Sequence, residues 1–214
     1  MNGLLRATIV AVLLACLPAA SRHADGGTAQ AKSASSAADP NEWTIDALNS
    51  GAGFAARHML VSTVRGHLGP VSGTIWYDGV NVSSIRAEAT IDVRRISTGN
   101  DDRDNHLRTD DFFDVPHHPT MTFKSKRVVP GASGHFTMVG DLTIRGTTRE
   151  VTLNVDGPQP ILKVQGVSRT AAMATTTINR FDYGLKWNNL IDAGGGALVA
   201  ADIVVTIDLE ATRR

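Results

Sequence analysis

The sequence of 214 residues has only one cysteine, few aromatic residues and no net charge. One cysteine excludes a disulfide within the chain and a metal site built from several thiolates. Lysine plus arginine and aspartate plus glutamate both number 21, so no excess charge points to nucleic acid or to an anionic surface. No stretch is long and apolar enough for an ordinary membrane span. The length fits one domain with a core of its own, preceded by a leader.

Known catalytic motifs are missing as well. The sequence contains no nucleophile elbow, no H-E-x-x-H, no C-x-x-C and no phosphate-binding glycine loop. His117 and His118 stand near Asp110, Asp111 and Asp114, but their spacing is irregular and prolines interrupt the segment, so it does not predict a metal site. We therefore expect a protein that is not an enzyme, with no catalytic residue, no metal and no cofactor.

The chain begins like an exported protein. Residues 1–20 place Arg6 before the apolar run Ala7–Ala15, which is typical of a signal sequence. Cys16 follows Leu13-Leu14-Ala15, a sequence that resembles the box at which bacterial lipoproteins are acylated on cysteine. The alternative is plain cleavage near Ala19 or Ala20, which would discard Cys16. Either way we expect export to the periplasm or cell envelope, with a membrane anchor if Cys16 is lipidated.

Residues 21–41 differ in composition from the rest of the chain. They are rich in alanine, serine, glycine and aspartate and contain no large apolar residue before the end of the segment. Such a segment cannot bury enough surface to fold, so we expect a disordered linker.

From residue 42 to residue 211, apolar and polar residues alternate. The clearest strand is expected over Val82–Ile96, and Met59–Val64 is expected to be a short helical or irregular connection. Further strands are expected at Val71–Tyr77, Thr120–Val129, Gly134–Arg145, Glu150–Asp156, Gly166–Ile178 and Ala200–Glu210. Each strand has one apolar face, and no long helical pattern is present to cover a parallel sheet. The pattern therefore favours an antiparallel sheet folded onto itself, as a sandwich or a closed barrel.

One segment stands out from these strands, and we call Asn100–Ser125 the lid segment. Asn100 or Asp101 can cap a short helix, whose first turn is acidic. Phe112 and Phe113 follow in surroundings too polar to bury them, so they must pack elsewhere. This combination predicts a short helical lid that feeds two aromatic rings toward a sheet.

The lid segment also carries a family resemblance. Its run D-R-D-x-H-L-R-x-D-D-F-F-D, followed by H-P-x-M-x-F-K-S, resembles the YceI-like family of extracytoplasmic lipid-binding proteins. Segments that fit in the same order are Trp43–Asp46, Phe54–Gly66, Gly140–Val151 and Ile178–Leu185. The resemblance covers about residues 42–211 and implies an all-β fold, an eight-stranded antiparallel lipocalin-like barrel. It decides between sandwich and barrel in favour of the barrel.

The resemblance also implies a function. The barrel is expected to bind, transport or store a long apolar lipid such as a polyisoprenoid, a quinone-like lipid or a fatty amide, outside the cytoplasmic membrane. The alternatives are a barrel with a filled core that serves as an interaction or stress-related module at the envelope, and a lid-gated enzyme that modifies a lipid. Relatives often pair, which leaves a homodimer open, and no nucleic-acid partner is expected.

Candidate ligand-binding residues are those expected to face the lumen; any single one of them is first of all a core residue, and as a set they line whatever the barrel holds. They are Phe54, His58, Ile75, Ile85, Ala87, Ala89, Ile91, Phe112, Phe113, Phe123, Phe136, Met138, Leu142, Ile203, Val205 and Ile207. The small residues Ala87, Ala89 and Gly140, with alanines of the run Ala171–Ala174, are expected to leave a channel open. His58 either meets a ligand head group or bonds to backbone, and Asp104, His106 and Arg108 are expected to hold the lid by caps and hydrogen bonds.

Overall fold

The computed structural model describes residues 39–59, 61–132, 134–188 and 198–214. The expected leader, Cys16 and most of the expected linker lie outside these residues. In the described part the strands are β1 (Glu42–Ile45), β2 (Gly51–His58), β3 (Ser62–Trp76), β4 (Arg86–Asp92), β5 (Thr120–Pro130), β6 (His135–Ile144), β7 (Thr147–Asp156), β8 (Leu162–Val164), β9 (Val167–Asn179) and β10 (Val199–Arg213). One α-helix, α1 (Asp101–Arg108), joins them in this part of the chain. None of the described helices is long and apolar enough to cross a membrane.

The strands close into a ring. Antiparallel pairing runs in the order β10-β2-β3-β4-β5-β6-β7-β9, and β9 pairs back to β10 from Ser168↔Arg213 to Asn179↔Asp202. This ring contains eight of the described strands, as the expected barrel requires. β1 lies outside the ring and pairs with both β10 and β3, while β8 forms a hairpin with β9. The all-β barrel with a short helix is thus confirmed.

The inward faces of the strands are apolar, because side chains alternate along each strand. On β10, for example, Val205 is buried while its neighbour Val204 is 46% exposed.

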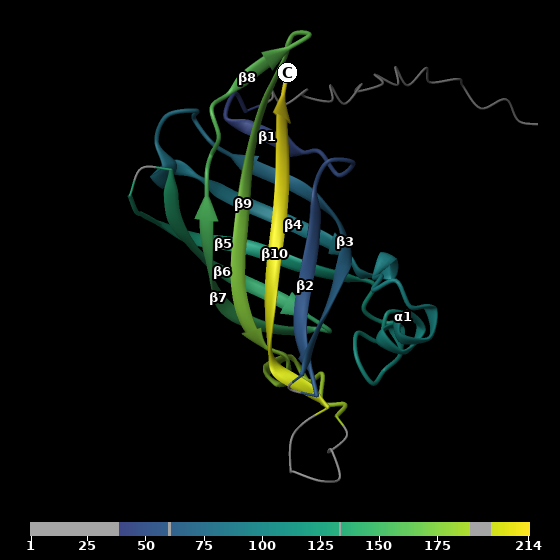
Figure 1. Cartoon of the computed structure of the whole chain (residues 1–214). Helices are drawn as coiled ribbons and strands as arrows, with labels where there is room; N and C mark the ends of the chain where they lie inside the picture. Colours follow the sequence, from purple (N-terminus) through teal and green to yellow (C-terminus); the bar gives the residue numbers. More distant parts are fainter. Residues whose placement is uncertain (1–38, 60, 133, 189–197) are drawn as a thin grey trace, which may run out of the picture. The chain divides into compact units, whose positions relative to one another are not determined.

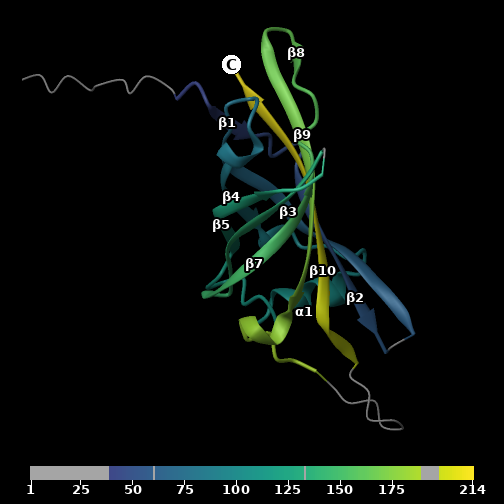
Figure 2. The same ribbon diagram turned by 90° about the vertical axis from the view of Figure 1, so that its left-hand side faces the viewer.

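Figures 1 and 2 show β1, the β8–β9 hairpin and the C-terminus at one end of the barrel, which we call the β1 end. α1 lies toward the other end, which we call the lid end.

The helix forms as its sequence predicts. The Asn100 side chain accepts a hydrogen bond from the Arg103 amide at 2.9 Å, which caps the helix. Asp101, Asp102 and Asp104 occupy the first turn, where the helix dipole favours negative charge. The helix ends at Arg108, and Thr109 already has an extended backbone.

Two expected elements are wrong in their limits. The strand expected over Val82–Ile96 is only β4, with short 3₁₀ helices at Val82–Ser84 and Val93–Arg95 on either side. Asn81 and Asp92 cap these turns through their side chains, a local alternative to strand pairing. Where an irregular connection was expected over Met59–Val64, β3 already begins at Ser62, and Ser62 pairs with His58 of β2.

Candidate functional site

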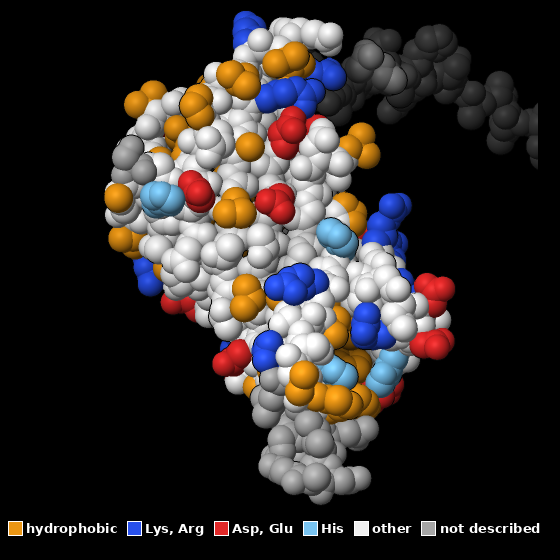
Figure 3. All heavy atoms as spheres, in the orientation of Figure 1, with side chains coloured by type: hydrophobic (Ala, Val, Ile, Leu, Met, Phe, Trp, Pro, Cys, Tyr) orange, Lys and Arg blue, Asp and Glu red, His pale blue; other side chains and the backbone are white. Residues whose placement is uncertain are grey.

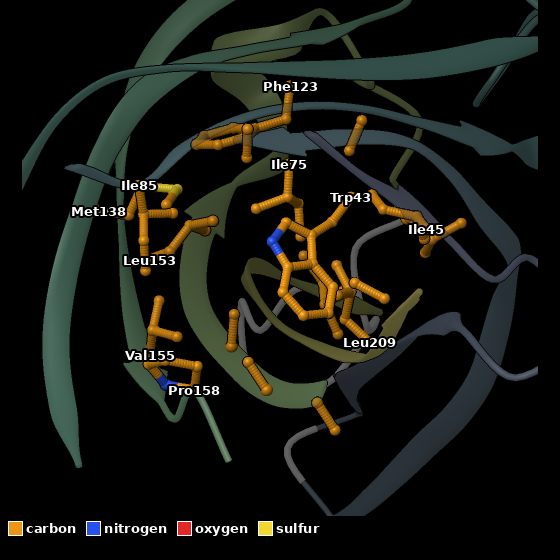
Figure 4. A pocket seen from close by; sticks show the side chains of 18 of the residues that line it. Trp43, Ile45, Ile75, Ile85, Phe123, Met138, Leu153, Val155, Pro158 and Leu209 are labelled. Atoms are coloured by element: carbon orange, nitrogen blue, oxygen red, sulfur yellow. The ribbon is translucent and has the colours of Figure 1, made fainter. Parts of the chain in front are cut away.

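The barrel interior holds an apolar cavity at the β1 end, which we call the upper chamber. It has a volume of about 120 Å³. Its walls come from β1, β3 to β7, β9 and β10, and Figure 4 shows several of these side chains around the space. The lining contains no aspartate, glutamate, lysine, arginine or histidine. A space with such walls excludes charged groups, because burying an unpaired charge is costly.

Trp43 closes the upper chamber toward the β1 end. Its side chain is 0% exposed, and Figure 4 shows the indole between the labelled side chains of the chamber. The indole Nε1 donates a hydrogen bond to the Tyr77 carbonyl at 3.0 Å. The Arg213 guanidinium lies 4.3 Å from the centre of the ring and donates to the Pro40 carbonyl at 2.7 Å. Trp43 is therefore held by a hydrogen bond and a cation–π contact as well as by packing.

A second apolar cavity, the lower chamber, lies toward the lid end and has a volume of about 80 Å³. The part of the lid segment that precedes β5 supplies Leu107, Phe112 and Phe113 to its wall. The remaining lining residues are Phe54, Ala56, Leu68, Met121, Ile144, Ile178, Arg180, Tyr183, Leu185, Val199, Ile203 and Val205. The two aromatic residues of the lid are thus packed against the barrel, as expected.

Arg180 is the charged residue of the lower chamber, and it is only 3% exposed. Its guanidinium donates to the carbonyls of Leu185 (2.6 Å), Trp187 (2.8 Å), Ala200 (3.0 Å) and Val199 (3.2 Å). Burial lowers the pKa of Arg180 below its ordinary value. Because its hydrogen bonds go to backbone on both sides of residues 189–197, Arg180 ties the two ends of this connection together.

Tyr183 lies beside Arg180 in the same wall. Its hydroxyl has no hydrogen-bond partner among the described residues, and burial raises the pKa of Tyr183 to about 12. The hydroxyl therefore stays protonated at any physiological pH.

An outer pocket of about 330 Å³ adjoins the lower chamber at the lid end. The rings of His106, Phe112 and Trp187 form its aromatic wall, with centroids 5.0 to 5.3 Å apart. Arg57, Asp102 and Arg103 add charged groups of both signs to its lining. Figure 3 shows hydrophobic and histidine side chains gathered on the surface in the region of α1. Apolar walls with a polar rim suit the amphiphilic end of a lipid.

Side-chain hydrogen bonds hold the lid segment in place. Asp104 is buried and accepts from the Thr98 amide at 2.8 Å and from the Thr98 hydroxyl at 2.5 Å. Arg108 donates to the Ile96 carbonyl at 2.8 Å and to the Arg94 carbonyl at 3.2 Å. The His106 Nε2 atom lies 2.8 Å from the Asp111 Oδ2 atom, within hydrogen-bond distance. These contacts agree with a structural role for Asp104, His106 and Arg108.

Burial by itself raises the pKa of Asp104, but the hydrogen bonds from Thr98 and Ser97 and the charge of Arg108 lower it more. The net result is a pKa below the ordinary value, so the carboxylate is ionised at neutral pH.

The candidate lining residues fall into three groups. The upper chamber is lined by Ile75, Ile85, Ala87, Ala89, Ile91, Phe123, Phe136, Met138, Leu142, Val205 and Ile207. The lower chamber is lined by Phe54, Phe112, Phe113, Ile203 and again Val205. His58, the last residue of β2, lies in neither chamber and instead lines the outer pocket. Whether any of these residues binds a lipid remains a prediction.

The small residues play different roles from one another. Ala87, Ala89, Ala171, Ala172 and Ala174 do line the upper chamber. Gly140 does not leave space there, which corrects the sequence-based expectation. A Cβ atom on Gly140 would lie 2.5 Å from the Phe123 ring, so the ring of the neighbouring strand already fills the position.

Sequence reasoning missed several wall residues. Trp43 opens a recognised segment, but its four-residue strand is too short to show which way the indole points. Arg180 lies in the recognised segment Ile178–Leu185, between Asn179 and Phe181, but nothing in that segment indicates that the arginine side chain is buried. Met121, Leu153, Val155, Thr176 and Leu209 follow the alternation of their strands and could have been included.

The histidines of the lid segment do not gather into a metal site. His117 Nδ1 pairs with Asp114 at 2.7 Å, and the pair lowers the pKa of Asp114. Within the described ranges, no group of three histidine, cysteine, aspartate or glutamate side chains could hold a metal ion.

Comparison with known proteins identifies the family. The model of the YceI-like domain matches residues 43–211. The chain belongs to the YceI-like family. Among curated relatives of this YceI-like chain, a UPF0312 protein of Staphylococcus aureus is 35% identical over 157 residues, covering 72% of this chain and 87% of the relative. A UPF0312 protein of Staphylococcus epidermidis is 34% identical over 158 residues, covering 72% and 88%.

Solved structures resemble this YceI-like barrel too. The YceI protein of Campylobacter jejuni is 27% identical, with a TM-score of 0.63, and the match covers 74% of this chain and 90% of that one. BcnA of Burkholderia cenocepacia is 20% identical with a TM-score of 0.64, covering 78% and 98%. A polyisoprenoid binding domain of Saccharophagus degradans is 18% identical with a TM-score of 0.57, covering 80% and 98%. These last two likenesses show the fold alone.

Proposed function

We propose that this YceI-like barrel binds one long apolar lipid in its lumen and carries or stores it outside the cytoplasmic membrane. The observation that carries the proposal is the upper chamber, whose lining has no charged side chain and is closed by Trp43. Burying about ten hydrocarbon carbons along the whole lumen contributes on the order of 8 kcal/mol, less the cost of association. Apolar contact alone is therefore enough for useful affinity.

The chambers favour a thin, flexible chain. A cavity of about 150 Å³ accepts a molecule the size of benzene, and the upper chamber of about 120 Å³ is no larger. A polyisoprenoid, the tail of a quinone-like lipid or a fatty amide has the required narrow cross-section. The polyisoprenoid binding of the Saccharophagus degradans domain supports this ligand class for the same fold. A catalytic role has less support, because neither chamber wall contains a histidine, cysteine, lysine, aspartate or glutamate that could act as a base or activate one of the wall hydroxyls.

Native mass spectrometry of the purified chain tests the proposal. We expect a bound mass that organic extraction removes and that reappears when a long isoprenoid is added back. A barrel that never holds lipid would support the filled-core interaction module instead. A chemical change in the added lipid would support the lipid-modifying enzyme.

Export and anchoring are part of the same proposal, and their basis is the sequence of residues 1–20. If Cys16 is acylated, Cys16→Ser moves the protein from the membrane fraction to the soluble fraction. Wild-type protein that is already soluble would refute the anchor and leave plain export. Wild-type protein retained in the cytoplasm would refute both.

A further inference from the structure

The two chambers are stacked along the barrel and meet at a single level. Inward-facing neighbours on the same strand divide between them. On β9, Thr176 lines the upper chamber and Ile178 the lower, and on β6, Leu142 lines the upper and Ile144 the lower. β10 repeats the division, with Ile207 above and Ile203 below. The boundary is therefore one layer of side chains across the lumen.

Two residues of the described chain line both chambers, Met121 on β5 and Val205 on β10. Both are buried, at 2% and 5% exposure. Strand pairing fixes their positions, since Met121 pairs with Ile91 on β4 and Val205 lies between Phe54 and Thr176. Met121 and Val205 together form the partition between the chambers.

The two halves of this partition differ in mobility. Valine is branched at Cβ and has essentially one free torsion, so Val205 is the fixed half. Methionine is unbranched and has three rotatable bonds, which lets it adopt another rotamer at small cost. We propose that Met121 is a gate that sets the chain length of the ligand. With the gate closed, the upper chamber alone accepts a short chain; with Met121 turned aside, a long chain runs through both chambers.

This inference rests on the proposed lipid binding and adds the residue that determines specificity. The upper chamber of about 120 Å³ and the lower chamber of about 80 Å³ are each too small for a long chain. A long isoprenoid can be buried in this barrel only by crossing the level of Met121. A short isoprenoid has no need to cross it.

The test compares two probes, the single-unit isoprenoid alcohol prenol, which is about the size of benzene and suits the upper chamber alone, and the long alcohol solanesol, on delipidated full-length protein. Met121→Phe places a rigid ring in the partition, and we expect the affinity for solanesol to fall about tenfold or more relative to prenol. A loss of this size corresponds to a few methylene groups that are no longer buried. Met121→Ala widens the partition, so the ratio of solanesol to prenol affinity should rise. This second variant keeps the test decisive if Met121→Phe does not fold.

Met138→Phe is the matched control, since Met138 lines the upper chamber but not the partition. It should weaken both alcohols alike. If Met121→Phe also weakens both alike, or if neither Met121 variant changes the ratio, the gate is refuted while lipid binding stands. If wild-type protein binds neither alcohol, the proposed function is refuted and the gate with it.

Discussion

Packing of the lid segment against the barrel is predicted to depend on the ring of Phe112, and Phe112→Ala tests this prediction. Phe112 is buried, and the centre of its ring lies 5.1 Å from the centre of the His106 ring and 5.3 Å from that of the Trp187 ring. Replacing a buried phenylalanine by alanine costs about 3–5 kcal/mol. Phe112 already borders the lower chamber and the outer pocket, so part of its surface has no packing partner to lose. We therefore expect the low end of the range, about 3 kcal/mol.

Urea unfolding of delipidated protein measures this loss, and the melting temperature should fall by roughly 6–12 °C. Phe113→Ala is the graded comparison, because Phe113 is half-buried and should cost only about 1–2 kcal/mol. Leu48→Ala is the control for an exposed apolar residue and should change stability by less than about 0.5 kcal/mol. If Phe112→Ala unfolds like wild type, the lid does not dock through this ring.

Further predictions concern the buried polar groups and the upper chamber. The pKa of Asp104 is lower in the folded protein than in the unfolded chain, so ionisation of this carboxyl group stabilises the fold. This contribution is complete above the unfolded-state pKa of about 4 and is lost as the pH falls through the folded-state pKa. Acid unfolding of Asp104→Asn should therefore depend less on pH than acid unfolding of the wild type. Arg180→Lys should destabilise by about 3 kcal/mol or more in urea unfolding, because one ammonium group cannot reach the four carbonyls that the guanidinium bonds. Ala89→Phe adds a benzene-sized ring to the upper chamber, so lipid should no longer copurify with the protein. The free energy of unfolding should fall by roughly 1–3 kcal/mol, because the ring overpacks the wall. Lipid that still copurifies would contradict the place of Ala89 in that wall.

Much of the barrel could be predicted because its information is local. Along β10, alternate residues are apolar, and the structure turns Ile203, Val205 and Ile207 into the lumen. The cap at Asn100 and the acidic first turn of α1 are likewise readable within a few residues. The closure of the ring was not readable in this way, since β9 and β10 pair through a register that only the assembled sheet defines. The family resemblance supplied that step.

Whether a small residue leaves space or is covered depends on the neighbouring strand. Ala89 and Gly140 both occupy inward positions, yet only Ala89 borders the upper chamber. Gly140 pairs with Ser125, and the nearby ring of Phe123 leans over it. The alternation of one strand cannot reveal this cover, because it depends on the register of two strands. The same limit explains why the chamber boundary at Met121 gave no signal in the sequence.

The two ends of the lumen are closed by different interactions, and this affects how a lipid could enter. At the β1 end, Trp43 is fixed by a hydrogen bond to Tyr77 and by Arg213 over its ring. At the lid end, the lower chamber and the outer pocket share the apolar side chains of Leu107 and Phe112. Moving apolar side chains breaks no hydrogen bond, whereas moving Trp43 leaves a buried donor without its partner. The lid end is therefore the less costly route to the lumen. It follows that Phe112→Ala should speed lipid release even where the folded fraction is unchanged, a difference that dissociation kinetics on folded protein can detect.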